Sequence, residues 1–275
     1  MQPLRRLAGG RGGGLRRQSC RFAAPAVLVA LMGLVACGLA PEAAAGTSAG
    51  APPATAQAVL ERVEAAARDR RDMSARLTIE AIDARGRRAR SVLMAAFIRE
   101  PALARIEIAE PSALRGQTYV LDGAARELRL YLPVTHQIVV QRLDEAPVAP
   151  VAPERLLRDM GDRQGAPALR LIGTEQAEGA TLYVLEGPLP SSSIASGGDV
   201  SLTGLPLPSL GDTLADGGSV RIWVDGRSWV PVRFVVYDPR GGQRASLSLT
   251  AVRLDQGLRP EQLRRLPEDA EVVEG

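Results

Sequence analysis

The sequence predicts a mainly β protein with α elements, in which one amphipathic helix precedes a long, curved antiparallel meander. Apolar residues recur with a helical period up to about Arg71, and from Met73 they alternate with polar residues as in a strand. Short strand-like runs then follow one another, separated by Gly, Pro and Asp turn signals. Because these connections are too short for helical crossovers, neighbouring strands should run antiparallel.

The first 36 residues are typical of an export signal. Residues 1–21 carry six arginines and no acid, and an apolar run of 15 residues follows from Phe22 to Ala36. That run is short for a membrane span, and it ends in small residues directly before a cysteine. Leu34-Val35-Ala36-Cys37 resembles the bacterial lipobox, in which the cysteine thiol is acylated and the chain is cut just before it. We therefore expect an exported protein that is lipid-anchored through Cys37 to the cell envelope, on its periplasmic or extracytoplasmic side.

Two other outcomes for the leader stay open. Cleavage further on, after Ala43–Ala45, would leave a soluble secreted protein, and an uncleaved apolar run would serve as an anchor.

Removing residues 1–36 reverses the sign of the net charge. The whole chain has 34 basic and 31 acidic residues, and six arginines leave with the leader, so 28 basic residues remain against 31 acidic ones, a net charge of −3. This balance argues against nucleic-acid binding. Cys20 and Cys37 are the only 2 cysteines, so the mature chain has no disulfide.

The mature chain divides into a linker and a folded domain. Residues 37–54 are rich in Gly, Ala and Pro without periodicity, which predicts a flexible linker before a domain spanning 55–275. Thr55 is placed to cap a helix that runs to about Arg71. The apolar face of this helix comprises Val59, Leu60, Val63, Ala66 and Ala67.

The rest of the domain is predicted to be strands with two interruptions. A Pro-rich stretch, 146–165, contains a predicted short helix at 153–161, and 187–218 is a long loop whose leucines favour a lid over apolar surface. After the first strand, from Met73 to Ala81, the predicted strands are 89–99, 105–109, 117–122, 127–132, 137–142, 168–175, 181–186, 219–224, 231–237 and 243–254.

Some of these strands are apolar on both faces. Val92–Ile98 contains no polar residue, whereas an exposed face of an antiparallel sheet should be polar. We therefore expect the helix or loops to cover one side of the sheet, and bound apolar material or another subunit to cover the other.

The sequence offers little catalytic chemistry, so we expect a protein that is not an enzyme and that needs no cofactor or metal. His136 is the only histidine and lies in a predicted turn. There is no second histidine for a zinc site, the one cysteine of the mature chain is the predicted lipidation site Cys37, and there is no lysine for Schiff-base chemistry.

The order of motifs from residue 97 onward resembles the outer-membrane lipoprotein carrier (LolA-like) superfamily. The resemblance covers about residues 55–273. It rests on Phe97–Ile108, Glu110-Pro111, Gly116-Gln117, Val120–Gly123, Leu130–Pro133, Trp223–Asp225, Trp229–Arg233 and Leu266–Val273.

The resemblance implies an unclosed antiparallel half-barrel, with an N-terminal helix and short helices that lid its concave face. In such a fold the concave apolar face receives acyl chains of lipids or lipoproteins, and a lipidated Cys37 would make this chain an anchored member. We predict an acyl-binding surface that includes Met94, Phe97, Ile106 and Leu121. The alternative is a non-enzymatic envelope assembly or regulatory protein that uses the same fold without lipid cargo and acts on an envelope protein partner.

We predict that Cys37→Ser abolishes lipidation. The variant should stay unprocessed or be released as a soluble form, because two acyl chains are needed for stable anchoring. Intact mass and membrane fractionation check this outcome. A wild-type chain that begins at Gly46 without added acyl mass would contradict it.

Overall fold

The computed structural model describes residues 53–82, 86–143, 169–177, 179–188 and 218–274. The predicted leader, Cys37, nearly all of the linker, the 153–161 helix and most of the 187–218 loop lie outside these residues. The elements are α2 (Ala56–Asp69), β1 (Asp72–Ile82), β2 (Arg88–Ile98), β3 (Leu103–Glu110), a 3-10 turn η1 (Ser112–Leu114), β4 (Thr118–Asp122), β5 (Glu127–Leu132), β6 (Gln137–Arg142), β7 (Arg170–Ala177), β8 (Ala180–Pro188), β9 (Ser219–Asp225), β10 (Pro231–Tyr237), β11 (Gln243–Leu254), α5 (Pro260–Arg264) and β12 (Glu271–Glu274).

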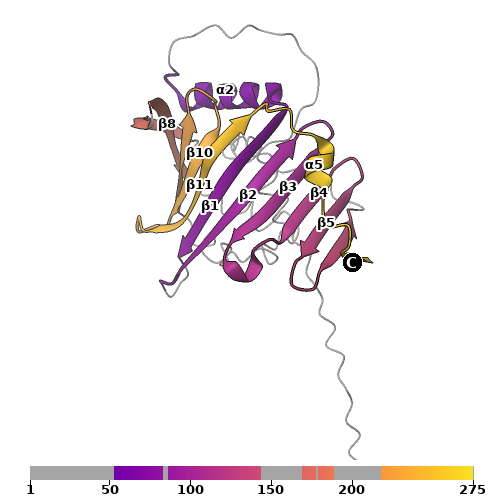
Figure 1. The fold of residues 1–275 in the computed structure, drawn as a ribbon. Helices are drawn as coiled ribbons and strands as arrows, with labels where there is room; N and C mark the ends of the chain where they lie inside the picture. Colours follow the sequence, from indigo (N-terminus) through magenta and orange to yellow (C-terminus); the bar gives the residue numbers. More distant parts are fainter. Residues whose placement is uncertain (1–52, 83–85, 144–168, 178, 189–217, 275) are drawn as a thin grey trace, which may run out of the picture.

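The strands form one curved, open sheet of 12 strands (Figure 1). Its order is β12-β6-β5-β4-β3-β2-β1-β11-β10-β9-β8-β7, so β1–β6 and β7–β11 are two antiparallel meanders joined where β1 pairs with β11. Only β12, beside β6, pairs in parallel among the described strands. The predicted fold class, a mainly β half-barrel with an N-terminal helix, is confirmed.

Helix α2 begins where the sequence predicts and buries the predicted apolar face except Ala66, which is half-buried. The hydroxyl of Thr55 accepts a hydrogen bond from the backbone N–H of Ala58 at 3.2 Å, which caps the first turn. Val59, Leu60 and Val63 are buried together with residues of β8 and β9. The guanidinium of Arg62 lies 5.0 Å from the centroid of the Trp229 ring, which also stacks on Tyr183. These contacts hold the helix against the β9–β10 turn.

Helix α5, which the sequence analysis did not predict, packs on the other face of the sheet. Its Leu263 is buried against Ile98, Leu103 and Val120. Along β2, Ile98 and Phe97 are neighbours and point to opposite faces, and Phe97 belongs to the cluster on the helix α2 side. We call the α2 side the inner face and the α5 side the outer face.

Asp72 fixes the chain that leads into α5. Its carboxylate is buried and accepts backbone hydrogen bonds from Gln256 (2.8 Å), Gly257 (2.9 Å) and Leu258 (3.2 Å). The start of β1 and the segment after β11 are thereby held together, and α5 follows directly on the outer face.

Leu60→Ala should lower the free energy of unfolding by about 2–4 kcal/mol, because the side chain is buried and its removal leaves a cavity under α2. Urea unfolding measures the loss. Glu61→Ala, on the exposed side of the same helix turn, should change stability by less than about 0.5 kcal/mol. Equal effects of the two changes would contradict the packing of α2, and two separate calorimetric transitions would contradict the prediction of one domain.

Candidate functional site

The inner face carries a continuous apolar surface on β1–β5 and β11. Strand register arranges it in rows across the sheet: Leu249, Leu77, Leu93 and Ile108 form one row, with each residue directly opposite the next. We define the inner apolar face as the buried cluster Met73, Ala75, Leu77, Ile79, Leu93, Phe97, Ala104, Ile106, Ile108, Tyr119, Leu121, Leu128, Val230 and Leu249.

Helix α2 does not contribute to this surface. Its buried residues cluster instead with Tyr183, Leu185, Ile222 and their neighbours on β7–β10. The two clusters lie on the same face, since Ile222, Phe234, Leu247 and Ile79 are successive partners across β9, β10, β11 and β1. No residue of a described helix belongs to the inner apolar face, except that Leu114 of the 3-10 turn packs at its margin.

Three of the four predicted lining residues meet on the inner face. Phe97 and Leu121 both lie opposite Ala104, and Ile106 lies on β3 between the same two strands. All three are buried.

Met94 does not join them. It lies opposite Arg76 and Glu107 on the outer face and is 46% exposed. Met94 and Phe97 are three residues apart in one strand, an odd spacing that places them on opposite faces. The predicted set is therefore corrected to Phe97, Ile106 and Leu121. The uninterrupted apolar run of β2 has a second explanation as well, since α5 covers Ala96 and Ile98 on the outer face.

Tyr119 brings a polar group into the inner apolar face. It is 1% exposed, and this burial raises the pKa of its phenol above the ordinary value. The phenol is therefore protonated at neutral pH.

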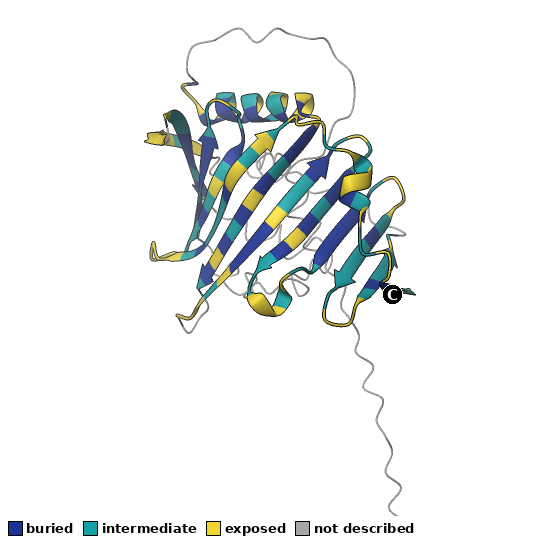
Figure 2. Ribbon diagram, in the orientation of Figure 1, coloured by how far each residue is buried: buried dark blue, intermediate teal, exposed yellow. Residues whose placement is uncertain are grey.

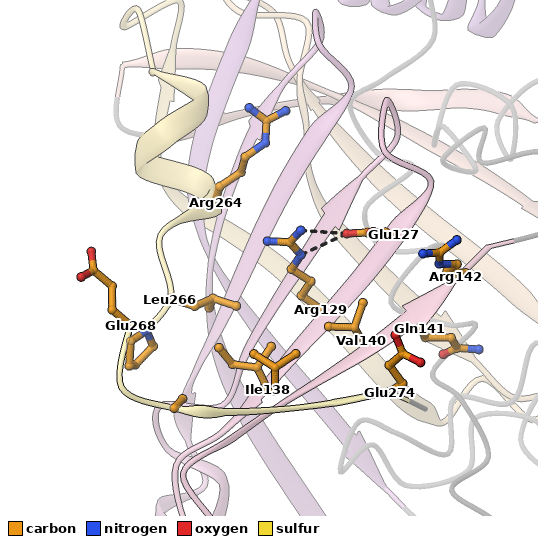
Figure 3. Close-up of a pocket in the computed structure, with 13 residues that line it drawn as sticks. Glu127, Arg129, Ile138, Val140, Gln141, Arg142, Arg264, Leu266, Glu268 and Glu274 are labelled. Atoms are coloured by element: carbon orange, nitrogen blue, oxygen red, sulfur yellow. Dashed lines mark hydrogen bonds and ion pairs between the residues drawn. The ribbon is translucent and has the colours of Figure 1, made fainter.

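A groove of about 800 Å³ lies on the outer face near the C-terminus, between β5, β6 and β12 and the chain after α5 (Figure 3). Its lining includes the apolar residues Ile138, Val140 and Leu266 and charged residues of both signs. Among them, Arg129 donates to a Glu127 carboxylate oxygen at 2.8 Å. The groove lies on the face opposite Phe97, Ile106 and Leu121, and its mixed charge does not suit an acyl chain.

An ion pair beside the groove anchors α5. Arg264 Nε donates to Asp122 Oδ2 at 2.7 Å, and Asp122 Oδ1 accepts from the backbone N–H groups of Ala124 and Ala125. Burial raises the pKa of Asp122, but the hydrogen bond from Arg264, those from Ala125 and Ala124, and the charge of Arg264 together lower it more. The pKa of this carboxyl therefore lies below its ordinary value.

His136, in the β5–β6 turn, contacts side chains on two different segments. Its Nε2 lies 3.2 Å from a carboxylate oxygen of Asp269, and its Nδ1 lies 3.1 Å from the Tyr131 hydroxyl. Both contacts are exposed, and they tie the turn to the segment between α5 and β12. In the part of the chain that the structure describes, no group of three or more His, Cys, Asp or Glu is placed to hold a metal ion. Within the same ranges, no helix has the length and apolar character that crossing a membrane requires.

The structure was compared with solved structures, and three of those that resemble it in part have different descriptions. An uncharacterized conserved protein from Thermus thermophilus is 22% identical, with 80% of this chain and 99% of that chain covered and a TM-score of 0.49. A LolA superfamily protein from Nitrosomonas europaea is 15% identical, with 78% and 99% covered and a TM-score of 0.34. The MucA/MucB complex of Pseudomonas aeruginosa contributes a chain that is 13% identical, with 78% and 62% covered and a TM-score of 0.44.

No protein-family model matches the sequence, and a search among curated proteins finds no match.

Asp122→Asn should make the free energy of unfolding less dependent on pH in the acid range. Because the folded pKa of Asp122 is lowered, its stabilisation is fully present above the unfolded pKa of about 3.9 and is lost as the pH falls through the folded value. At pH 7 the free energy of unfolding of the variant should be lower than that of wild type by about 1–2 kcal/mol. The expected loss is small because the Arg264 side chain is 39% exposed, so water screens its ion pair with Asp122. Urea unfolding at pH 7 and at pH 3 should show the difference from wild type shrinking on acidification.

The control is Asp269→Asn, an exposed carboxylate near the same groove. It should leave stability at pH 7 within about 0.5 kcal/mol of wild type. If the free energies of unfolding of Asp122→Asn and wild type differ by the same amount at pH 7 and at pH 3, the stabilisation does not come from the charge of Asp122.

Proposed function

We propose that this chain is a non-enzymatic, exported envelope protein that binds acyl chains of lipids or lipoproteins on its inner apolar face, and that it is held at a membrane through Cys37. The observation that carries the proposal is the mismatch between the apolar area of the sheet and the described helices. Rows of apolar side chains cross β11 and β1–β5, while the buried stripe of α2 packs only against β7–β10.

The physical reason is the free energy gained when apolar surface leaves water, about 25 cal/mol per Å². The residues of the inner apolar face are buried, and the described helices do not supply the apolar atoms that cover them. An acyl chain is apolar along its whole length and can lie along the rows formed by Phe97, Ile106 and Leu121.

A second candidate function rests on the burial of the same residues. Phe97, Ile106 and Leu121 are each at most 5% exposed, which is also the condition of an ordinary protein core. On this hypothesis the face has only a structural role, and the protein acts on an envelope protein partner in assembly or regulation. Extraction of the purified chain with organic solvent, followed by mass spectrometry, distinguishes the two functions, because only the first predicts co-purified acyl chains.

Phe97→Asp should reduce the affinity for a fluorescent fatty-acyl probe by at least about tenfold, because a carboxylate in the apolar row must be desolvated when the chain binds. Met94→Asp is the matched control. It places the same group three residues away on the same strand but on the exposed outer face, so it should leave probe binding unchanged.

Phe97→Ala keeps the test decisive if the aspartate variant does not fold. It removes a large apolar contact without adding charge, and it should weaken probe binding while circular dichroism shows an intact sheet. A folded wild-type chain with no probe binding and no extracted lipid would overturn the proposal and leave the structural hypothesis.

A further inference from the structure

One buried hydroxyl in the described part of the chain lacks a hydrogen bond. The buried polar and charged residues there are Arg70, Asp72, Ser91, Thr118 and Asp122. The other four make hydrogen bonds through their side chains, as buried polar groups normally do. Ser91 is the exception: it is 3% exposed, and its hydroxyl makes no hydrogen bond to a described residue.

Strand register places Ser91 on the inner face. It lies directly opposite Ile79 of β1, and Ile79 lies opposite Leu247 of β11. Along β2, Leu93 and Phe97 are two and six residues away, an even spacing that puts all three side chains on the same face. Ser91 therefore lies in the row next to that of Leu93, on the side of the β1–β2 turn.

The neighbours of Ser91 on this face cannot satisfy its hydroxyl. Ile79 lies across from it, and Leu93 and Ala89 lie on either side of it along β2, so all three neighbouring side chains are apolar. On the other side, the pairing of β2 with β3 ends at Val92, so no residue of β3 lies opposite Ser91. A buried hydroxyl without a hydrogen bond destabilises the folded chain, which suggests that this one serves a ligand.

We propose that Ser91 donates a hydrogen bond to the carbonyl oxygen of an acyl ester, and thereby fixes where the polar end of an acyl ligand lies on the inner face. This inference rests on the proposed function, because it requires the inner apolar face to hold an acyl chain. The serine hydroxyl supplies one donor and the ester carbonyl accepts it, so the contact satisfies both groups away from water.

An uncharged carbonyl suits this position better than a carboxylate. The buried cluster that defines the inner apolar face contains no basic side chain. Burial of a carboxylate without a paired cation is costly, and a single hydroxyl does not compensate for it. The ligand class is therefore an ester-linked acyl chain and not a free fatty acid.

The sizes of the neighbouring side chains give the ligand a direction. Toward the β1–β2 turn, the row after Ser91 consists of alanines, with Ala81 opposite both Ala245 and Ala89. In the other direction the face carries larger apolar side chains as far as Phe97, about 20 Å away along β2. The acyl tail therefore runs from Ser91 toward Phe97, and the headgroup lies over the alanines beside the turn.

The test compares two uncharged competitors of equal length, methyl hexadecanoate and octadecane, which differ by the ester group. Each displaces a fluorescent fatty-acyl probe from the full chain, purified in an uncharged detergent, after the affinity of each variant for the probe has been measured. Each competitor partitions into detergent equally for all variants, so the comparison with wild type cancels this effect. Ser91→Ala should weaken binding of the ester by about threefold to tenfold, the effect of one hydrogen bond, and leave octadecane binding unchanged.

Two further variants separate the hydroxyl from the rest of the residue. Ser246→Ala makes the same change on the outer face, opposite Glu80, and should alter neither affinity. Ser91→Thr keeps the hydroxyl and should keep the preference for the ester. Because Ser91→Ala removes a buried hydroxyl that lacks a hydrogen bond, the urea midpoint of the ligand-free variant should not fall.

Equal losses for both competitors in Ser91→Ala, or no loss for the ester, would overturn the role of Ser91 and leave the acyl-binding proposal in place. Tighter binding of hexadecanoic acid than of its methyl ester by the wild-type chain would overturn the ester as the ligand class. If the wild-type chain binds neither the probe nor either competitor, the proposed function itself fails, and this inference fails with it.

Discussion

The pairing of β1 with β11 is the contact on which the rest of the structure depends. It joins residues at the beginning and the end of the domain in register from Met73 opposite Leu254 to Ala81 opposite Ala245. Without it, β1–β6 and β7–β11 would be two separate meanders. We call the β1–β11 pairing the seam. The buried carboxylate of Asp72 holds one end of it in place, because it accepts three backbone hydrogen bonds from the segment that follows β11.

The same seam gives both faces of the sheet their chemistry. On the inner face it places Leu249 beside Leu77, so that the apolar rows of β1–β5 continue onto β11. On the outer face it places Ser246 beside Glu80, which lies opposite Arg90 on its other side. Figure 2 shows the consequence along the central strands, where buried and exposed residues alternate. One alternating sequence therefore encodes an apolar surface and a charged one.

Local sequence signals predicted most of the fold. The bounds of β5, β6, β10 and β11 agree with prediction, and α2 ends two residues before the predicted end. These elements have clear periods and clear turn residues at their ends. By contrast, α5 has five residues and β12 has four, which is too few to show a period, and both are held by contacts with distant strands.

The candidate sites were less predictable, because they depend on register between strands. Phe97, Ile106 and Leu121 were placed on one surface correctly, but Met94 was grouped with them although its odd spacing from Phe97 puts it on the other face.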